Sequence, residues 1–493
     1  MLFRNTAAQT ATQLSTYAGS ILVAPLMLDR LGLAAFGVWA VTGGMAAWAG
    51  ALDFGITRSL SRFVALEHGR DNQRGIQETI GAGMIALAPL IVIAALGALI
   101  AARPLSASIG TVGVAEMRSL LLASAVILAA QTTGRIVTAI PVGLSRMVGI
   151  NVALTMGRLV NVAFSLAALL IRPNLETYAW ANAAAEVVAL AIAYIGVRIV
   201  WRRRVVALPS RQRGTAIVRF AVTGQMRWVA VLVNTQTDKI VLAVFIGPRA
   251  AGSYEIANRI VAAVNAVGVL TLSAMIPALT TRVAREGREF FGRFYTAYTE
   301  RTTALSFPVY VVFAVLGLPL LHAWLGAVPP QADLVLIMLL AAYIVNVTTG
   351  VGTSIAEADG DPGLAARPAT WSALLNVALT VALAPLLGLP GVLAGTAVAI
   401  AFGALLFVVR FHRKYDLSLR LYFTSLWRPL AVSVVGGFPA AMAVILIYNS
   451  STTRVAALFL VAVVGGIYGL VTWLVAARLR LLPRALTLPA WRT

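Results

Sequence analysis

The sequence contains no cysteine and only three histidines among its 493 residues. The absence of cysteine excludes disulfides, thiol catalysis and Cys-ligated metals. His68, His322 and His412 lie far apart along the chain, so no pair has the spacing of metal ligands. No stretch matches GxxxxGK[ST], the Gly-rich loop that cradles nucleotide phosphates. We therefore expect no metal, no cofactor and no ATPase activity of the chain's own.

Charged residues are scarce as well. They make up 12% of the chain, whereas an average soluble domain carries about 25%. Hydrophobic residues make up 60%, and the mean hydropathy is +0.87. Apolar segments recur along the chain, each long enough to cross a hydrocarbon core of about 30 Å at about 1.5 Å per residue. This pattern predicts an all-α polytopic membrane protein with about 14 transmembrane helices.

The expected spans are 9–30, 34–64, 77–102, 117–142, 147–171, 176–200, 217–246, 250–281, 297–320, 333–358, 367–388, 391–411, 426–448 and 454–478. Basic clusters follow the second, sixth, eighth and twelfth of them and close the chain, as the positive-inside rule describes. We expect a multi-pass protein of the inner (cytoplasmic) membrane with both termini in the cytoplasm. The net charge of +21 then reflects topology and attraction to anionic lipids, and no nucleic-acid partner is expected.

The chain also repeats itself at one nearly constant offset. The matching segments are Leu31–Trp39 with Ile246–Tyr254, Thr132–Gly134 with Thr348–Gly350, and Asn161–Ala163 with Asn376–Ala378. An even number of spans per repeat restores the orientation, which predicts two parallel six-helix lobes, an architecture of alternating-access transporters. We place the first lobe at 1–205, the second at 206–420, and a C-terminal helix pair with a basic tail at 421–493. The basic segment from Arg198 to Arg213 is the expected linker between the lobes.

Ionisable residues inside the expected spans are candidate functional residues, because each costs about 2.5–3.5 kcal/mol to insert and usually faces a cavity or a partner. Polar residues recur at helical spacing, which predicts stripes that line a wet cavity. The stripes are Asn151, Thr155, Arg158 and Ser165; Tyr178, Asn182 and Glu186; and Thr223, Arg227, Asn234 and Asp238.

Arginine suits a diphosphate because its planar fork binds two oxygens and stays charged when buried. Arg135, Arg158 and Arg227 have no acidic residue within a helical turn, so we expect them to be unpaired. We interpret these three as contacts of a substrate phosphate, with Lys239 and Arg259 further along its path; a purely structural role is the alternative.

The acidic residues inside the spans are candidates for coupling to a cation, H⁺ or Na⁺, or for structural pairing. They are Asp53, Asp238, Glu255 and Glu186. Glu255 is spaced to pair with Arg259 on one helix face, whereas adjacent Asp238 and Lys239 point apart and need separate partners. A further acidic turn, at Glu357, Asp359 and Asp361, is interpreted as either a gate or a solvated loop.

Several motifs resemble the polysaccharide-biosynthesis (Wzx-type) flippases of the multidrug/oligosaccharidyl-lipid/polysaccharide exporter (MOP) superfamily. They are Arg30–Trp39, Leu52–Ile56, Thr237–Ile240 and Ile246–Tyr254. The resemblance implies two six-helix lobes, alternating access, and a polyprenyl-diphosphate-linked oligosaccharide carried from the cytoplasmic to the outer leaflet for surface polysaccharide synthesis. In the related lipid II flippases, two extra C-terminal helices border a groove for the lipid tail, and spans 426–448 and 454–478 match these in position.

Three alternatives stay open. A lipid II flippase would share this fold, and a cation-coupled multidrug antiporter would favour an acidic cavity over arginines. A membrane-embedded glycosyltransferase or ligase would need a catalytic carboxylate and large outside loops, and the expected loops are short. We therefore expect a transporter rather than an enzyme.

Overall fold

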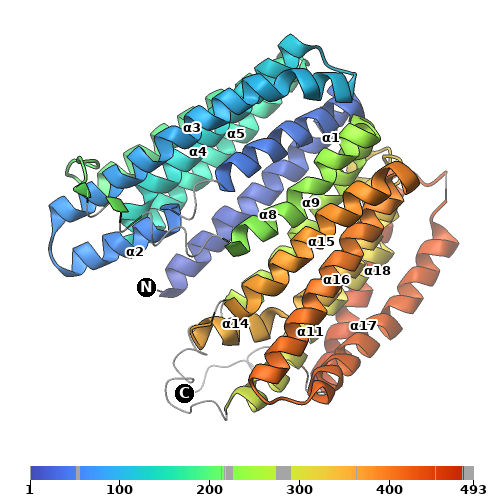
Figure 1. Ribbon diagram of the computed structural model, residues 1–493. Coiled ribbons are helices and arrows are strands. Elements are labelled where there is room, and N and C mark those ends of the chain that lie inside the picture. Colours follow the sequence, from blue (N-terminus) through green and yellow to red (C-terminus); the bar gives the residue numbers. More distant parts are fainter. Residues whose placement is uncertain are drawn as a thin grey trace. The chain divides into compact units, whose positions relative to one another are not determined.

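In a computed structural model, the protein is predominantly helical in the part that is described, which comprises residues 2–51, 56–211, 214–215, 217, 226–273, 290–361, 363–449, 451–479 and 481 (Figure 1). The helices are α1 (Leu2–Ala51), α2 (Ile56–Gly69), α3 (Gln73–Ile109), α4 (Val114–Gly143), α5 (Met147–Ile171), α6 (Leu175–Val200), α8 (Met226–Phe245), α9 (Pro248–Ser273), α11 (Phe290–Val315), α12 (Gly317–Leu325), α13 (Ala332–Val347), α14 (Gly350–Ala358), α15 (Gly363–Leu387), α16 (Leu389–Lys414), α17 (Leu419–Ile447) and α18 (Arg454–Arg478).

Many of these helices can cross a membrane. Within the described residues, ten spans are long and apolar enough, or eleven if Phe294–Val315 and Gly317–Leu325, bent by 67°, form one broken span. Lipid offers no hydrogen-bond partner to the backbone, so helices that satisfy their own N–H and C=O groups are the expected solution. The all-α polytopic class is thus confirmed, while the count of fourteen spans stays a prediction.

The chain forms two compact units, Met1–Glu255 and Ile256–Thr493. In the first unit α3 packs on α4, and α6 packs on both α4 and α5, while α1 lies against α5 and α8. In the second unit α15 pairs with α16, α11 with α17, and α12 with α18. Figure 1 shows the long helices of each unit running side by side. The lobe boundaries derived from the sequence repeat stay a prediction.

The repeat recurs in the backbone at two glycines. Gly32 interrupts α1 with φ 80° and ψ 169°, so that two helices meet there. Gly247, its equivalent in the second copy of the repeat, has φ 121° and lies between α8 and α9. Both torsions fall in the region that L-residues avoid and glycine tolerates. The sequence match of Leu31–Trp39 with Ile246–Tyr254 is therefore also a match in helix-breaking geometry.

Small residues let equivalent helix pairs approach closely in the two units. A Cβ on Gly157 of α5 would lie 2.8 Å from the Cβ of Ala189 on α6. In the second unit, a Cβ on Gly403 of α16 would lie 2.6 Å from the Cβ of Ser372 on α15. Ser372 is the repeat equivalent of Gly157, and Gly403 is adjacent to the repeat equivalent of Ala189. The same close contact therefore recurs in the second unit, with the glycine on the opposite helix of the pair. Close backbone approach of this kind drives helix association where lipid competes with apolar side chains.

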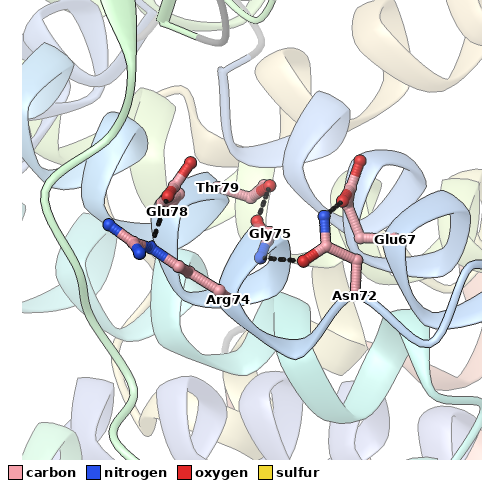
Figure 2. A network of polar contacts seen from close by, with 6 residues as sticks. All are labelled: Glu67, Asn72, Arg74, Gly75, Glu78 and Thr79. Carbon is pink, nitrogen blue, oxygen red and sulfur yellow. Dashed lines mark hydrogen bonds and ion pairs between the residues drawn. The ribbon is translucent and has the colours of Figure 1, made fainter.

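A polar network shapes the turn between α2 and α3 (Figure 2). The Asn72 Oδ1 caps α3 by accepting from the Gly75 N–H at 2.9 Å, and the Asn72 Nδ2 donates to Glu67 at 2.5 Å.

The expected linker packs beside this turn. The Ala207 N–H donates to the Gln77 carbonyl at 3.1 Å, and Trp201 is buried in the core of the first unit. The first half of the expected linker therefore packs as part of the first unit.

Two buried polar pairs join α8 to the start of α9. The Tyr254 hydroxyl donates to Asp238 Oδ2 at 2.7 Å, and Lys239 Nζ donates to Glu255 Oε2 at 3.1 Å. The side chains of Lys239 and Glu255 are 7% and 15% exposed. The prediction that Asp238 and Lys239 point apart to separate partners is confirmed.

The close α5–α6 contact predicts a cost for added volume. Gly157→Val should lower the free energy of unfolding by about 1–3 kcal/mol, because the branched side chain has no room against Ala189. Thermal unfolding in detergent measures the change. Gly149→Val is the matched control, since Gly149 also lies in α5 and a Cβ there would meet nothing within 4 Å. Equal melting temperatures for the two variants would contradict the packing argument.

The buried Lys239–Glu255 pair predicts non-additive mutations. Lys239→Met should destabilise by about 3–5 kcal/mol, because it removes the cation that lies 3.1 Å from a largely buried carboxylate, and Lys239→Met/Glu255→Gln should recover part of that loss. A double-mutant cycle from melting curves measures the coupling. Arg74, whose side chain is 85% exposed, pairs with Glu78 at 3.1 Å along one helix face (Figure 2), and their cycle should give only about 0.3–0.5 kcal/mol. Additive effects at Lys239 and Glu255 would refute the coupling.

Candidate functional site

A polar centre lies among three helices of the first unit. Glu186 of α6 is buried, and its Oε1 accepts from three donors: Gln131 of α4 at 3.1 Å, Arg158 of α5 at 3.3 Å and Asn161 of α5 at 3.4 Å. One turn along, the Ser165 hydroxyl donates to Asn182 at 3.2 Å, and both residues are buried. The carboxylate is thus held by hydrogen bonds from side chains of both neighbouring helices.

This geometry corrects one expectation and refines another. The expectation that Arg158 is unpaired is wrong: it forms an ion pair with Glu186 across helices, which spacing along one helix cannot reveal. The stripes on α5 and α6 are predicted to line a wet cavity. Part of each stripe instead faces the other helix, as the Ser165–Asn182 bond shows.

The centre nevertheless keeps a positive balance. The Arg158 side chain is still 39% exposed, and within the described residues only its Nη1 contacts an acidic group. Arg135 is exposed and lies one turn from Gln131, so both occupy the same face of α4. Arg158 contacts the single negative charge of Glu186, and Arg135 adds a second positive charge one helical turn along α4 from Gln131. A surface of this kind can accept an anionic group by bidentate hydrogen bonds.

The other candidate residues lie elsewhere. Lys239, Asp238 and Glu255 form the buried α8–α9 pairs described above. The expected Glu255–Arg259 pairing has a competitor, since Glu255 binds Lys239, and Arg259 is half-buried on the part of α9 in the second unit. Asp53 and the side chain of Arg227 lie outside the described residues.

The second unit holds a neutral polar centre that the sequence analysis did not single out as a site. The Asn376 Oδ1 accepts from the hydroxyls of Thr380 at 2.8 Å and Thr396 at 3.2 Å, and all three residues are buried. Asn376 is the repeat equivalent of Asn161, which donates to Glu186. The repeat was the signal that could have found it, because the matched asparagines occupy the same helix pair in each unit.

A second group that the sequence did not reveal surrounds His412 at the end of α16. Its Nε2 lies 3.2 Å from the Tyr295 hydroxyl, and its Nδ1 lies 3.1 Å from the Ser418 carbonyl oxygen. Side chains at the end of α16 bind the acidic turn that contains Asp359 and Asp361. Lys414 Nζ donates to Asp361 at 2.7 Å, and the Tyr415 hydroxyl donates to Asp359 at 2.9 Å. The hydrogen bond from Lys414 lowers the pKa of Asp361 below its ordinary value.

An apolar groove of about 580 Å³ lies between α17 and α18. Its walls are small and aliphatic residues, among them Val435, Gly436, Ala440 and Ile467. The Tyr468 hydroxyl, which is buried at the groove, is satisfied by the Ser433 carbonyl at 3.0 Å. The groove can therefore hold hydrocarbon without leaving that hydroxyl unpaired.

Comparison with known proteins identifies the fold and the family. The model of the family described as "Polysaccharide biosynthesis protein" matches residues 2–283, whereas a comparison with curated protein sequences finds no match. The chain is similar to the lipid II flippase MurJ in an inward closed conformation, with a TM-score of 0.74 at 11% identity over 96% of this chain and 99% of MurJ. It is also similar to an inward-facing multidrug resistance MATE family transporter of the MOP superfamily, with a TM-score of 0.63 at 16% identity over 83% of this chain and 96% of the other.

A eukaryotic MATE transporter, AtDTX14, is similar as well, with a TM-score of 0.55 at 11% identity over 86% of this chain and 100% of the other. Similarity at such low identity establishes the fold alone, which is that of MOP-superfamily transporters. The family match extends over more than half of the sequence. The chain therefore belongs to the polysaccharide biosynthesis protein family, as a multi-pass membrane protein with a transporter fold.

Proposed function

We propose that the protein is a flippase that moves a polyprenyl-diphosphate-linked oligosaccharide from the cytoplasmic to the outer leaflet by alternating access. The observation that carries the proposal is the basic polar centre at Glu186, Arg158 and Arg135, set among membrane-spanning helices. Inserting a charged side chain among membrane-spanning helices costs free energy, so such residues usually form an ion pair or serve a function. Arg158 has a partner, but Arg135 is exposed, which favours a task in binding an anion.

The headgroup would bind by exchanging partners. In the resting centre, Glu186 neutralises Arg158 while Gln131 and Asn161 hold the carboxylate. An arriving diphosphate would draw the Arg158 guanidinium away and engage Arg135, since each guanidinium can bind two phosphate oxygens. Arg227 is proposed as a third contact of the substrate phosphate, with Lys239 and Arg259 further along the path. Glu186, together with Asp53, Asp238 and Glu255, is the proposed place for a coupling cation, H⁺ or Na⁺.

The tail of such a substrate is a long hydrocarbon, and the groove between α17 and α18 supports this part of the proposal. A volume of about 580 Å³ lined by aliphatic and small residues suits an isoprenoid chain rather than a sugar. The substrate would thus have its polar group in one part of the protein and its tail in another. In our proposal, the protein lies in the inner membrane with both termini in the cytoplasm.

A lipid II flippase is the second candidate, favoured by the similarity to MurJ over 96% of the chain. Lipid II also carries a diphosphate and a polyprenyl tail, so the site chemistry is shared and only the sugar differs. A multidrug antiporter for cations fits less well, because the centre has two positive charges for one negative.

Loss of the protein should cause a lipid-linked glycan to accumulate in the inner leaflet, because synthesis continues while translocation stops. Accumulation is measured by extracting lipids from a deletion strain and probing sugar accessibility from the outer face. The chemical identity of the accumulated glycan separates the first candidate from lipid II. If no glycolipid accumulates and surface glycans stay normal, the flippase proposal fails.

The two arginines of the polar centre should matter for export. Arg135→Ala and Arg158→Ala should each reduce complementation of the deletion strain about tenfold, as expected for about 1.4 kcal/mol of lost headgroup binding. Arg74→Ala, which changes an exposed arginine outside the centre, is the control and should complement fully. Full complementation by both centre variants would remove these arginines as headgroup contacts.

Filling the apolar groove should reduce transport without unfolding the protein. Ala440→Trp places a bulky ring in the groove and should lower export about tenfold by excluding the tail. Export is measured in the complementation assay, and folding by melting temperature. Leu446→Trp is the matched control, because Leu446 also lies on α17 but is 76% exposed and does not line the groove. Full export by Ala440→Trp would exclude the groove as the tail site.

A further inference from the structure

A pocket of about 750 Å³ lies in the first unit, at the end where α5 meets α6. The turn of residues 172–174 joins two candidate membrane spans there, Met147–Ile171 and Leu175–Val200. The pocket therefore lies at a boundary between hydrocarbon and water. Its volume is within the range of about 300–1,000 Å³ that suits a small molecule. It shares no residue with the polar centre around Glu186 or with the groove between α17 and α18.

The lining of this pocket changes from polar to apolar along the helices. Arg172 and Glu176 lie at the turn, whereas Phe164 lies about two turns earlier on α5, roughly 12 Å deeper into the span. Phe164 and Trp180 line the pocket and are 37% and 43% exposed. A pocket with a charged rim and aromatic walls that extend into the hydrocarbon suits an amphipathic molecule. In this position that molecule is a lipid.

Arg172 and Glu176 bring one charge of each sign to the rim without neutralising each other. Both residues are exposed, and neither forms an ion pair with any residue that the structure describes. The Glu176 Oε1 accepts from the Ser119 hydroxyl of α4 at 2.5 Å, while no donor of the described chain bonds to Oε2. The rim therefore offers separate contacts for an anion and for a cation.

The same serine orients the aromatic wall. The Trp180 Nε1–H donates to Ser119 Oγ at 2.9 Å, so one hydroxyl links the indole to α4 and to the Glu176 carboxylate. The Asn174 side chain caps α6 by accepting from the Glu176 N–H at 2.7 Å, which fixes the start of the helix. Glu176 and Trp180 are one turn apart on one face of α6. Since an indole face attracts cations as a carboxylate does, the two residues form a cation subsite.

A zwitterionic phospholipid matches this arrangement. Its phosphate is an anion that the Arg172 guanidinium can bind through two oxygens. A primary ammonium, as in phosphatidylethanolamine, offers three N–H donors to the open oxygen of Glu176. The quaternary ammonium of phosphatidylcholine has no N–H to donate, and phosphatidylglycerol has no cation at all. The pairing of an arginine with a separate carboxylate thus favours a headgroup with a phosphate and a primary ammonium.

We propose that the pocket at the end of α5 and α6 is a binding site for a phospholipid of the phosphatidylethanolamine type. Arg172 holds the phosphate, Glu176 and the face of Trp180 hold the ammonium, and an acyl chain lies along Phe164. The bound lipid packs against the two helices that carry the polar centre further along their length. The site does not depend on the identity of the cargo or on which leaflet the turn faces.

Lipids with the same acyl chains and different headgroups test the proposal. The full-length protein in detergent is titrated with dioleoyl phosphatidylethanolamine, phosphatidylcholine or phosphatidylglycerol, and bound lipid is measured by native mass spectrometry. The binding that is lost in Arg172→Gln/Glu176→Gln is the share of the pocket. In that share, phosphatidylethanolamine should bind about tenfold more tightly than the other two, because only its ammonium donates to a carboxylate. Equal affinities would overturn the proposal, and a preference for phosphatidylglycerol would do so by making this an anionic-lipid site.

Single substitutions separate the two charges. Glu176→Gln should lower the affinity for phosphatidylethanolamine about tenfold without lowering that for phosphatidylglycerol, because only the ammonium loses its partner. Arg172→Gln should lower both affinities, since both lipids carry a phosphate. Glu116→Gln and Arg103→Gln are the matched controls and should bind both lipids as the unmodified protein does. Glu116 and Arg103 lie near the same end of the first unit, around the turn between α3 and α4, and do not line the pocket.

Unfolding cannot imitate this result, because a misfolded Glu176→Gln protein would lose both lipids rather than one. Phosphatidylethanolamine should also raise the melting temperature of the unmodified protein and of Glu116→Gln, but not that of Arg172→Gln/Glu176→Gln. Unchanged affinity in Glu176→Gln would overturn the ammonium subsite, and unchanged affinity in Arg172→Gln would overturn the phosphate subsite. None of these measurements involves transport, so they stand or fall separately from the flippase proposal.

Discussion

Close approach of helices at small residues is the constraint on which the rest of the structure depends. In lipid, apolar side chains gain little by leaving their surroundings for one another, so packing and hydrogen bonds must hold the helices together. Gly157 against Ala189 and Gly403 against Ser372 bring α5 to α6 and α15 to α16. Polar side chains can bond across these pairs only because the backbones lie so near, as Ser165 does with Asn182.

The close packing of helices also determines which charged side chains can be buried between them. A carboxylate such as Glu186 is stable between helices because Gln131, Arg158 and Asn161 reach one of its oxygens. The equivalent place in the second unit has no charge, and Asn376 takes hydrogen bonds from two threonines instead. The first unit thus has an ionic centre and the second a neutral one at repeat-equivalent positions. An anionic cargo would be drawn to the first.

A flippase must bind an amphipathic molecule and let it go at the other leaflet. In our proposal, different parts of the structure meet these demands. Basic side chains gather in the first unit, and an aliphatic groove lies between the last two helices of the second.

Composition and periodicity were enough to predict the helical membrane fold, since the hydrocarbon core demands long apolar helices whatever the tertiary arrangement. The internal repeat likewise related Gly32 to Gly247 and Asn161 to Asn376, because repeats preserve helix breaks and buried polar positions. Spacing along the helix also correctly predicted that Asp238 and Lys239 have separate partners, since adjacent residues on a helix point apart.

Spacing along one helix could not pair Arg158 with Glu186 on the next helix, or bring Lys414 to Asp361. The sequence placed each of these residues on its own helix or turn and showed which of them carry charge. Their partners were decided by the tertiary structure alone, because only the packing of one helix on another determines which polar side chains meet.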